Sequence, residues 1–202
     1  MSLGIQGILL AAGSASRFGS DKLAHRLDDG TPIVIASARH LREALPASLA
    51  VVRSTRSPVA ALLRDEGLQI VECPEAAEGM GVSLAAGVRA SAAATGWVVV
   101  LGDMPFIRPD TIRRVAERLV AGEVLVAPFF GGERGHPVGM GAVFRDRLEA
   151  LRGDEGARSL LREHARRMAH LDVDDPGVLR DIDTQDDLAA GRTAGKAPGR
   201  TA

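Results

Sequence analysis

Several residue types are scarce in this chain of 202 residues, and their scarcity excludes whole classes of protein. Cys73 is the one cysteine, so neither an intramolecular disulfide framework nor a multi-cysteine zinc site can form. Tyrosine is absent and aromatic residues make up 3% of the chain, which leaves few platforms for stacked bases. Together with a formal net charge of -1, this composition argues against nucleic acid as a partner.

Long apolar runs are also missing. No stretch approaches the roughly 18 apolar residues of a membrane span, and no basic segment precedes a long apolar stretch at the N-terminus. We therefore expect no membrane partner and a cytoplasmic location. The length favours one domain over residues 1–190, followed by a flexible tail over 191–202, whose small, polar residues cannot bury enough apolar area to fold alone.

A stretch of small residues follows the first apolar run. Residues 8–10 (ILL) have the composition of a buried strand, and residues 13–16 and Gly19 are then all Gly, Ser or Ala. Such a loop lets backbone N–H groups approach a ligand closely, and its two cations, Arg17 and Lys22, suit phosphate oxygens. The glycine spacing is neither that of GxxxxGK nor that of GxGxxG, so a plain strand-to-helix turn with solvated charges is the alternative interpretation.

The strongest predicted strand is WVVVL at residues 97–101, and it leads directly into Gly102 and Asp103. In an open α/β sheet, ligands bind beyond the carboxyl ends of the strands. Mg²⁺ prefers hard oxygen ligands and usually joins one or two carboxylates to substrate phosphates. Asp103 is therefore a candidate Mg²⁺ ligand, the alternative being an Asp that closes a turn before Pro105.

Predicted strands and helices alternate along the chain, which indicates an α/β fold with a mostly parallel central sheet and helices on both faces, a Rossmann-like three-layer sandwich. The expected helices cover residues 33–45, 58–66, 79–94, 109–120 and 157–167. The expected strands cover residues 8–10, 49–52, 68–71, 97–101, 124–127 and 171–173.

Several motifs resemble, in family order, those of the nucleotidyltransferases of molybdenum cofactor biosynthesis, the MobA-like NTP transferases. LAAGSASRFGSDK at residues 10–22 resembles their LAAGxSxRxGxxK signature, and LGDMPF at residues 101–106 resembles their metal-binding segment. The resemblance implies a fold of the nucleotide-diphospho-sugar transferase type and an Mg²⁺-dependent enzyme. It implies nucleotide binding by Leu10, Ala11, Ala12, Gly13, Ser16, Arg17, Lys22, Ser83 and Gly102. It implies catalytic roles for Arg17, Lys22 and Asp103.

A second acidic segment, DIDTQDDL at residues 181–188, is similar to the family's DIDTPEDL segment. In an extended segment, Asp181 and Asp183 point to one side and Ile182 points to the core. The resemblance implies metal binding by Asp103 and a second carboxylate, for which we choose Asp183 over Asp181. A helix capped by Thr184, with acidic residues in its first turn, is the alternative interpretation.

Two further segments are expected to bind the acceptor. RGHPVGM at residues 134–140 is similar to the family's RGHPVxF segment, which implies acceptor contacts for Arg134, Gly135, His136 and Pro137. GDEGAR at residues 153–158 resembles a segment of the cytidylyl branch, so Arg158 is a further candidate, while Asp154 would cap or precede a helix. For Ser83, at the start of a predicted helix, a capping role is the alternative to nucleotide contact.

The implied reaction transfers CMP from CTP to the terminal phosphate of molybdenum-bound molybdopterin and releases pyrophosphate. Ala12 and the GDEGAR segment favour CTP, because the guanylyl branch usually has Gly at the position of Ala12. GTP, or a sugar phosphate as acceptor, is the alternative on the same fold. A carrier that delivers the cofactor without chemistry is the alternative outside catalysis, and a molybdoenzyme is the expected protein partner.

Overall fold

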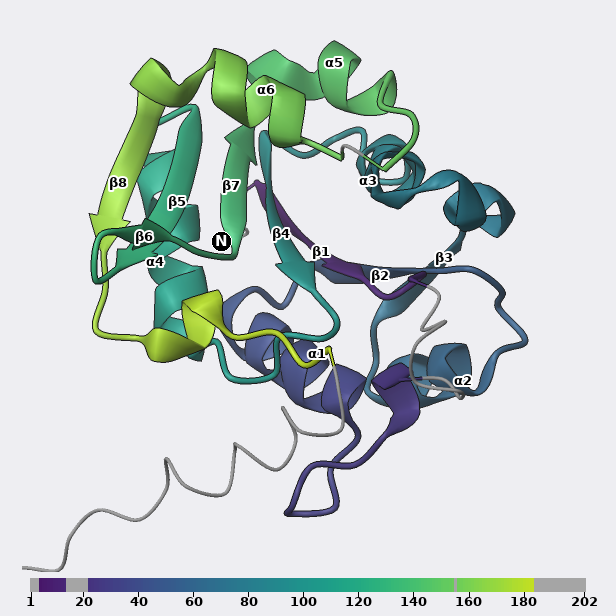
Figure 1. Ribbon diagram of the computed structural model, residues 1–202. Coiled ribbons are helices and arrows are strands. Elements are labelled where there is room, and N and C mark those ends of the chain that lie inside the picture. Colours follow the sequence, from purple (N-terminus) through teal and green to yellow (C-terminus); the bar gives the residue numbers. More distant parts are fainter. Residues whose placement is uncertain (1–3, 14–21, 155, 184–202) are drawn as a thin grey trace, which may run out of the picture.

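A single sheet of eight strands forms the centre of the computed structural model, which describes residues 4–13, 22–154 and 156–183 (Figure 1). The strand order is β3-β2-β1-β4-β7-β5-β6, with β8 paired to β5. All pairs are parallel except those of β7 with β4 and β5 and that of β6 with β5. The strands are β1 (Ile5–Leu10), β2 (Ser48–Val52), β3 (Gln69–Glu72), β4 (Gly96–Leu101), β5 (Leu125–Phe130), β6 (Glu133–Arg134), β7 (Val138–Gly141) and β8 (Met168–Asp172).

Helices cover both faces of this sheet, and the two faces have separate hydrophobic cores. One face packs against α1 (Ile33–Ala44), α2 (Pro58–Asp65) and α4 (Pro109–Val120). The other face packs against α3 (Met80–Arg89), α5 (Arg145–Glu149) and α6 (Arg158–Glu163). Short 3₁₀ turns complete the chain: η1 (Lys22–Ala24), η2 (Pro74–Glu78), η3 (Ala142–Phe144), η4 (Ala165–Arg167) and η5 (Pro176–Leu179). The expected three-layer α/β architecture is confirmed.

Strand β4 shows why the sequence folds this way. Its run of Val residues between Trp97 and Leu101 lies between the two cores, with side chains alternating from one face to the other. Trp97 is fully buried, and its ring N–H donates a hydrogen bond to the Ser91 hydroxyl at 2.9 Å. The indole N–H is therefore satisfied although it is buried, as is usual for a buried Trp.

Several observed elements differ from the predicted ones, among them β8, which begins at Met168 and not at residue 171. The helix expected over residues 79–94 ends at Arg89, and the one expected over 157–167 divides into α6 and η4. Strand β7 was not among the expected strands, and it enters the sheet antiparallel between β4 and β5. The sequence of β7, VGMG, has too little β-branched character to be recognised as a strand.

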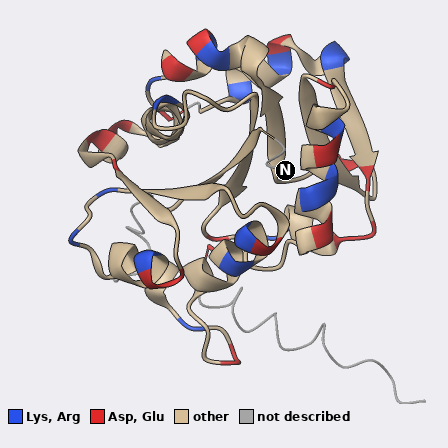
Figure 2. Cartoon of the chain, turned by 180° about the vertical axis from the view of Figure 1, so that it is seen from behind, with Lys and Arg blue, Asp and Glu red and all other residues tan. Residues whose placement is uncertain are grey.

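Charged side chains lie mainly on the helices and loops, where blue and red residues are mixed, while the strands are mostly uncharged (Figure 2). Such a mixed surface is typical of helices that keep one face in water. Within the described residues, no helix has the length and apolar character needed to cross a membrane.

A buried carboxylate fastens the C-terminal segment of the described chain to helix α4. Asp175, which is 2% exposed, accepts hydrogen bonds from the Thr111 hydroxyl at 2.6 Å and from the backbone N–H groups of Arg108 at 2.9 Å and Gly177 at 3.1 Å. Two of these donors, the Thr111 hydroxyl and the Gly177 N–H, would be left buried without a partner if this carboxylate were removed. Asp175 therefore fixes the start of the segment that leads to Asp183.

We expect Asp175→Ala to lower the free energy of unfolding by about 3 kcal/mol, because three donors lose a charged acceptor. Asp174→Ala is the matched control, since Asp174 is exposed and should change stability by less than about 0.5 kcal/mol. Urea denaturation of the wild type and both variants measures the difference. Equal midpoints for the two variants would show that this carboxylate is not a structural anchor.

Candidate functional site

A cavity of about 340 Å³ opens at the carboxyl ends of β1 and β4. The chain runs from β1 outward to β2 and β3 and then returns to β4 on the other side of β1, so this is a point where the strand order reverses. In open α/β sheets, such a point is where ligands bind. The cavity is lined by Leu10, Ala12, Gly13, Lys22, Leu23, Ala76, Ala77, Gly79, Met80, Ser83, Leu101, Asp103 and Asp154.

The ends of β1 and β4 are held together beneath this cavity. The backbone N–H of Gly102 donates to the Leu10 carbonyl at 2.9 Å, and a Cβ at position 102 would lie 3.0 Å from that oxygen. Ala11 is buried in the core on the side of α1, while Ala12 and Gly13 line the cavity. The structure thus places Ala12 and Gly13 where a ligand would lie, and Ala11 and Gly102 as support beneath it.

Lys22 joins the two carboxylates that the sequence suggested as metal ligands. Its ammonium nitrogen lies 2.9 Å from Asp103 Oδ2 and 2.9 Å from Asp183 Oδ1. Partial burial alone would lower the pKa of Lys22, but the hydrogen bonds to Asp183 and Asp103 outweigh it and raise this pKa above its usual value. Lys22 is therefore fully charged at neutral pH.

The backbone brings the two carboxylates together. Ile182, which is fully buried, donates its N–H to the Asp103 carbonyl at 3.0 Å, and its neighbours Asp181 and Asp183 are exposed. The predicted alternation of this segment is thus present. The pKa of Asp181 is raised, first by partial burial and then by the negative charges of Asp183 and Asp103. Of the two exposed carboxylates, Asp183 is the one that contacts Lys22.

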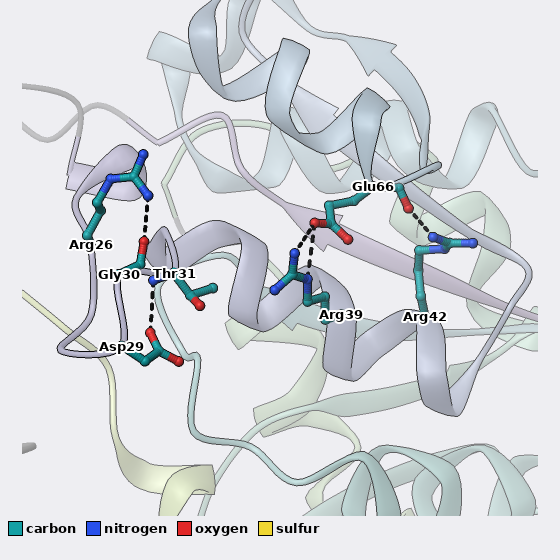
Figure 3. A network of polar contacts seen from close by, with 7 residues as sticks. All are labelled: Arg26, Asp29, Gly30, Thr31, Arg39, Arg42 and Glu66. Atoms are coloured by element: carbon teal, nitrogen blue, oxygen red, sulfur yellow. Dashed lines mark hydrogen bonds and ion pairs between the residues drawn. The ribbon is translucent and has the colours of Figure 1, made fainter.

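Polar contacts fasten the segment that carries Lys22 (Figure 3). The Arg26 side chain donates to the Gly30 carbonyl at 2.5 Å, and Asp29 accepts from the Thr31 N–H at 2.8 Å. The backbone of Ile33 in turn donates to His25 at 2.8 Å, at the start of α1. The turn between η1 and α1 is therefore closed on itself.

Helix α1 is in turn tied to the end of α2. Arg39 donates two hydrogen bonds to the Glu66 carboxylate, at 3.0 and 2.6 Å, and Arg42 donates to the Glu66 backbone carbonyl (Figure 3). From its buried side, α1 also contacts the site, because the Ser37 hydroxyl donates to the Gly102 carbonyl at 3.1 Å. Helix α1 thus supports both the Lys22 segment and the strand end that carries Asp103.

The opposite wall of the cavity is the start of helix α3. The helix begins at Met80, and its first residue is preceded by Gly79, with φ of 132° and no side-chain cap. Ser83 does not cap this helix, which was the alternative considered for it, because Ser83 lies one turn inside the helix, almost fully buried at 4% exposure. Its hydroxyl contacts the Cys73 thiol, whose pKa is raised by burial. Ser83 lines the cavity, as expected of a nucleotide contact.

The GDEGAR segment packs onto this helix start. Gly81 donates its N–H to the Gly153 carbonyl at 2.9 Å, and a Cβ at Gly79 would lie 2.2 Å from the Gly153 carbonyl carbon. Because position 79 has no side chain, Gly153 packs directly against it, and the next residue, Asp154, lines the cavity. Asp154 precedes helix α6, as expected, and does not cap it, because α6 begins at Arg158 without a side-chain cap. Its place in the cavity is not predictable from the sequence, since the two walls lie far apart along the chain.

The predicted acceptor residues form a second group beside Asp103. His136 donates its backbone N–H to the Val178 carbonyl at 2.9 Å and precedes the cis peptide bond of Pro137, while its ring Nδ1 is buried without a hydrogen-bond partner in the described part of the chain. Burial first, then the positive charges of Arg134 and Arg158, lower the pKa of His136 to about 4, although Asp103 acts in the opposite direction. The ring is therefore neutral at pH 7.

The family model of the MobA-like NTP transferase domain matches residues 7–168. The chain belongs to this family. Among curated relatives, it is 30% identical to the purine catabolism protein PucB of Bacillus subtilis, over 93% of this chain and 96% of PucB. It is also 27% identical to the nicotine blue oxidoreductase of Paenarthrobacter nicotinovorans, over 91% of this chain and 94% of that protein.

A solved structure with high similarity is Rv0371c of Mycobacterium tuberculosis, which is 29% identical to this chain with a TM-score of 0.78, over 94% of this chain and 98% of Rv0371c. A manganese complex of Rv0371c matches with a TM-score of 0.74 and 28% identity, over 92% of this chain and 96% of that one. As a MobA-like NTP transferase, the present chain is an enzyme of the nucleotidyltransferase class.

The carboxylates of this MobA-like site suit a divalent cation. Asp103 and Asp183 already converge on one cationic group, and both offer hard oxygen donors. Among the described residues there is no group of three or more His, Cys, Asp or Glu side chains able to hold a metal. Such a two-carboxylate site fits a cation that takes its other ligands from water and phosphate, as Mg²⁺ commonly does.

Not every predicted residue of the family site can be placed. Ser16 and Arg17 lie outside the described residues, as does Thr184. Arg134 and Arg158 are exposed, and neither is among the residues that line the cavity. Gly135 and Pro137 are buried, and a Cβ at Gly135 would lie 2.4 Å from the Val178 carbonyl oxygen, so these two residues hold the loop that carries His136.

The lowered pKa of His136 makes stability depend on pH. In the unfolded chain this ring takes up a proton near pH 6.5, whereas in the folded chain it does so only near pH 4, so stability is lost as the pH falls through this range. We expect the wild type to lose about 2 kcal/mol more than His136→Gln between pH 7 and pH 5. Urea denaturation at both pH values measures this, and equal losses would contradict a buried neutral ring.

Proposed function

We propose that this chain transfers CMP from CTP to the terminal phosphate of a molybdopterin-type acceptor that carries molybdenum. An oxygen of the acceptor phosphate forms a bond to the α-phosphorus of CTP, the bond between the α-phosphorus and the bridging oxygen breaks, and pyrophosphate leaves. The acceptor phosphate is already ionised at pH 7, so the reaction needs positioning and charge neutralisation rather than a general base.

The observation that carries this proposal is the meeting of Lys22, Asp103 and Asp183, of which Lys22 and Asp103 line the cavity. A cavity lined by Gly13, Lys22 and Asp103, with Asp183 bound to the same lysine, suits a triphosphate with its metal ion. In the proposed site, Asp103 and Asp183 hold Mg²⁺, which would neutralise phosphate charge when bound. Lys22 and Arg17 bind phosphate oxygens, and Arg17 provides the fork that suits them.

Three features support cytosine as the base. Ala12 and the GDEGAR segment resemble the cytidylyl branch, and Asp154 lines the cavity beside Gly79. A carboxylate accepts a hydrogen bond from the amino group of cytosine, whereas uracil would present a carbonyl oxygen there. Guanine also offers N–H donors, so the choice of CTP over GTP depends on the branch motifs.

On the acceptor side, Arg134, Arg158 and the neutral His136 flank Asp103 in the proposed arrangement. Two guanidinium groups suit an anionic acceptor, and a neutral imidazole offers a hydrogen bond without added charge. The product would pass to a molybdoenzyme partner. A guanylyltransferase on the same site is the competing function.

The proposal predicts binding of CTP in the presence of Mg²⁺. Asp103→Ala should weaken this binding at least tenfold, because a metal ligand is lost, and should change the melting temperature little, because Asp103 is partly exposed. Calorimetric titration with CTP, GTP, ATP and UTP, each with and without Mg²⁺, measures this. Asp110→Ala, which removes an exposed carboxylate on α4, is the control.

The outcomes of this titration separate the candidates. Mg²⁺-dependent binding of GTP without CTP would establish the guanylyl alternative, and failure of the wild type to bind any nucleotide would overturn the proposal. Release of pyrophosphate on addition of the molybdopterin-type acceptor distinguishes the transferase from a cofactor carrier, which binds ligand without turnover.

The placement of Asp154 predicts discrimination between CTP and UTP. Asp154→Asn should bind UTP more tightly relative to CTP, by about tenfold, because the amide can turn its N–H₂ toward the uracil carbonyl. Competition titrations with both nucleotides give the ratio. Asp146→Asn on α5, outside the cavity, should keep the wild-type ratio, and an unchanged ratio in the Asp154 variant would remove this residue from base recognition.

A further inference from the structure

Lys22 occupies the position between the two carboxylates that the proposed metal ion would need. Its ammonium nitrogen is 2.9 Å from one oxygen of Asp103 and 2.9 Å from one oxygen of Asp183. Two carboxylates this close repel each other unless a cation lies between them. In the structure that cation is Lys22, so the pair is already neutralised in part without a metal.

A divalent cation and this ammonium group cannot both hold the same two oxygens. Mg²⁺ binds carboxylate oxygens at about 2.1 Å, closer than an ammonium does, so the two cations would be forced together. Their mutual repulsion would be strong, because Lys22 and Asp103 are both largely shielded from water, at 13% and 25% exposure. A metal ion that takes these two oxygens therefore displaces Lys22.

The side chain is suited to leaving. The chain contains 25 Lys and Arg residues, of which only Lys22 and Lys196 are lysines. An arginine would hold a carboxylate with two parallel bonds in a fixed plane, whereas lysine carries a compact charge on a flexible stem. Because backbone hydrogen bonds close the turn after η1, Lys22 can move by its side chain alone.

The displaced ammonium group of Lys22 would also have a new binding partner. Lys22 lines the cavity, so a ligand there lies within reach of the released ammonium. A triphosphate would offer it oxygens of high negative charge in place of the two carboxylates. The metal would then gain the carboxylates and Lys22 would gain the phosphates, so each binding event would assist the other.

We propose that Lys22 is a built-in competitor of the divalent cation and thereby couples metal binding to nucleotide binding. The inference rests on the proposed metal site at Asp103 and Asp183. Metal alone binds weakly because it must displace Lys22 without compensation. Nucleotide removes this obstacle by binding the displaced ammonium.

The test is the affinity for Mn²⁺, followed by electron paramagnetic resonance, for the wild type and for Lys22→Met, which keeps the length of the side chain and removes its charge. Without nucleotide, we expect Lys22→Met to bind Mn²⁺ about tenfold more tightly than the wild type. CTP should raise the Mn²⁺ affinity of the wild type about tenfold or more, and that of the variant less than about threefold.

Matched variants locate the effect. Lys196→Met removes the other lysine and should behave as the wild type. Asp103→Asn in the Lys22→Met background should remove the tight Mn²⁺ site, which shows that the gained affinity lies at these carboxylates. Circular dichroism establishes that each variant is folded.

Equal or weaker Mn²⁺ binding by Lys22→Met in the absence of nucleotide would overturn the inference, as would the absence of measurable Mn²⁺ binding in both proteins. The metal-only comparison needs no nucleotide, so it is independent of the proposed reaction. If Lys22→Met shows the gain but CTP has no effect on the wild type, the competition stands and the coupling to CTP is overturned.

Discussion

The approach of two carboxylates to one ammonium group is the constraint on which the rest of the site depends. Asp103 and Asp183 lie 80 residues apart in sequence, and like charges do not gather without help. The backbone bond from Ile182 to the Asp103 carbonyl fixes their distance, and the burial of Ile182 fixes which way its neighbours point. Lys22 then supplies the charge that makes the arrangement stable.

The sheet topology explains why these segments meet. Strands β1 and β4 are adjacent and parallel, so the loop after each one begins at the same edge. The η5 segment reaches this edge because Asp175 holds its start on α4 and Val178 accepts the N–H of His136. The antiparallel β7 then places His136 beside Asp103, since β7 pairs directly with β4. One edge of the sheet thus receives segments from four parts of the chain.

The sequence was sufficient for the fold class and for the central strands, because continuous β-branched runs and capped, amphipathic helices are local signals. Helix α4 begins and ends at the predicted residues. Strand β7 was missed because its two glycines and a methionine carry little strand preference, and its position depends on its neighbours. Helix α5 was missed because five residues are too few to show a period.

Some site residues were likewise predictable from local signals, and others depend on contacts between distant segments. Asp103 was predictable, since it follows the strongest strand, and motif resemblance added Lys22 and Asp183. For Ser83, the alternative of a capping role is excluded, because Ser83 is buried one turn inside α3. The place of Asp154 in the cavity was not predictable, because it results from the contact of Gly153 with Gly79 and Gly81, two distant segments with no shared pattern.

Membership of the family establishes the fold of this chain but does not by itself establish which reaction it catalyses. Relatives of similar length and similarity carry names as different as a purine catabolism protein and an oxidoreductase, so the argument for activity must come from the site. The charged residues of the cavity come from separate walls: Lys22 and Asp103 near the ends of β1 and β4, and Asp154 on the loop packed against α3. A ligand that satisfies both walls needs anionic groups at one end and hydrogen-bond donors at the other. A nucleoside triphosphate whose base carries an amino group has this polarity.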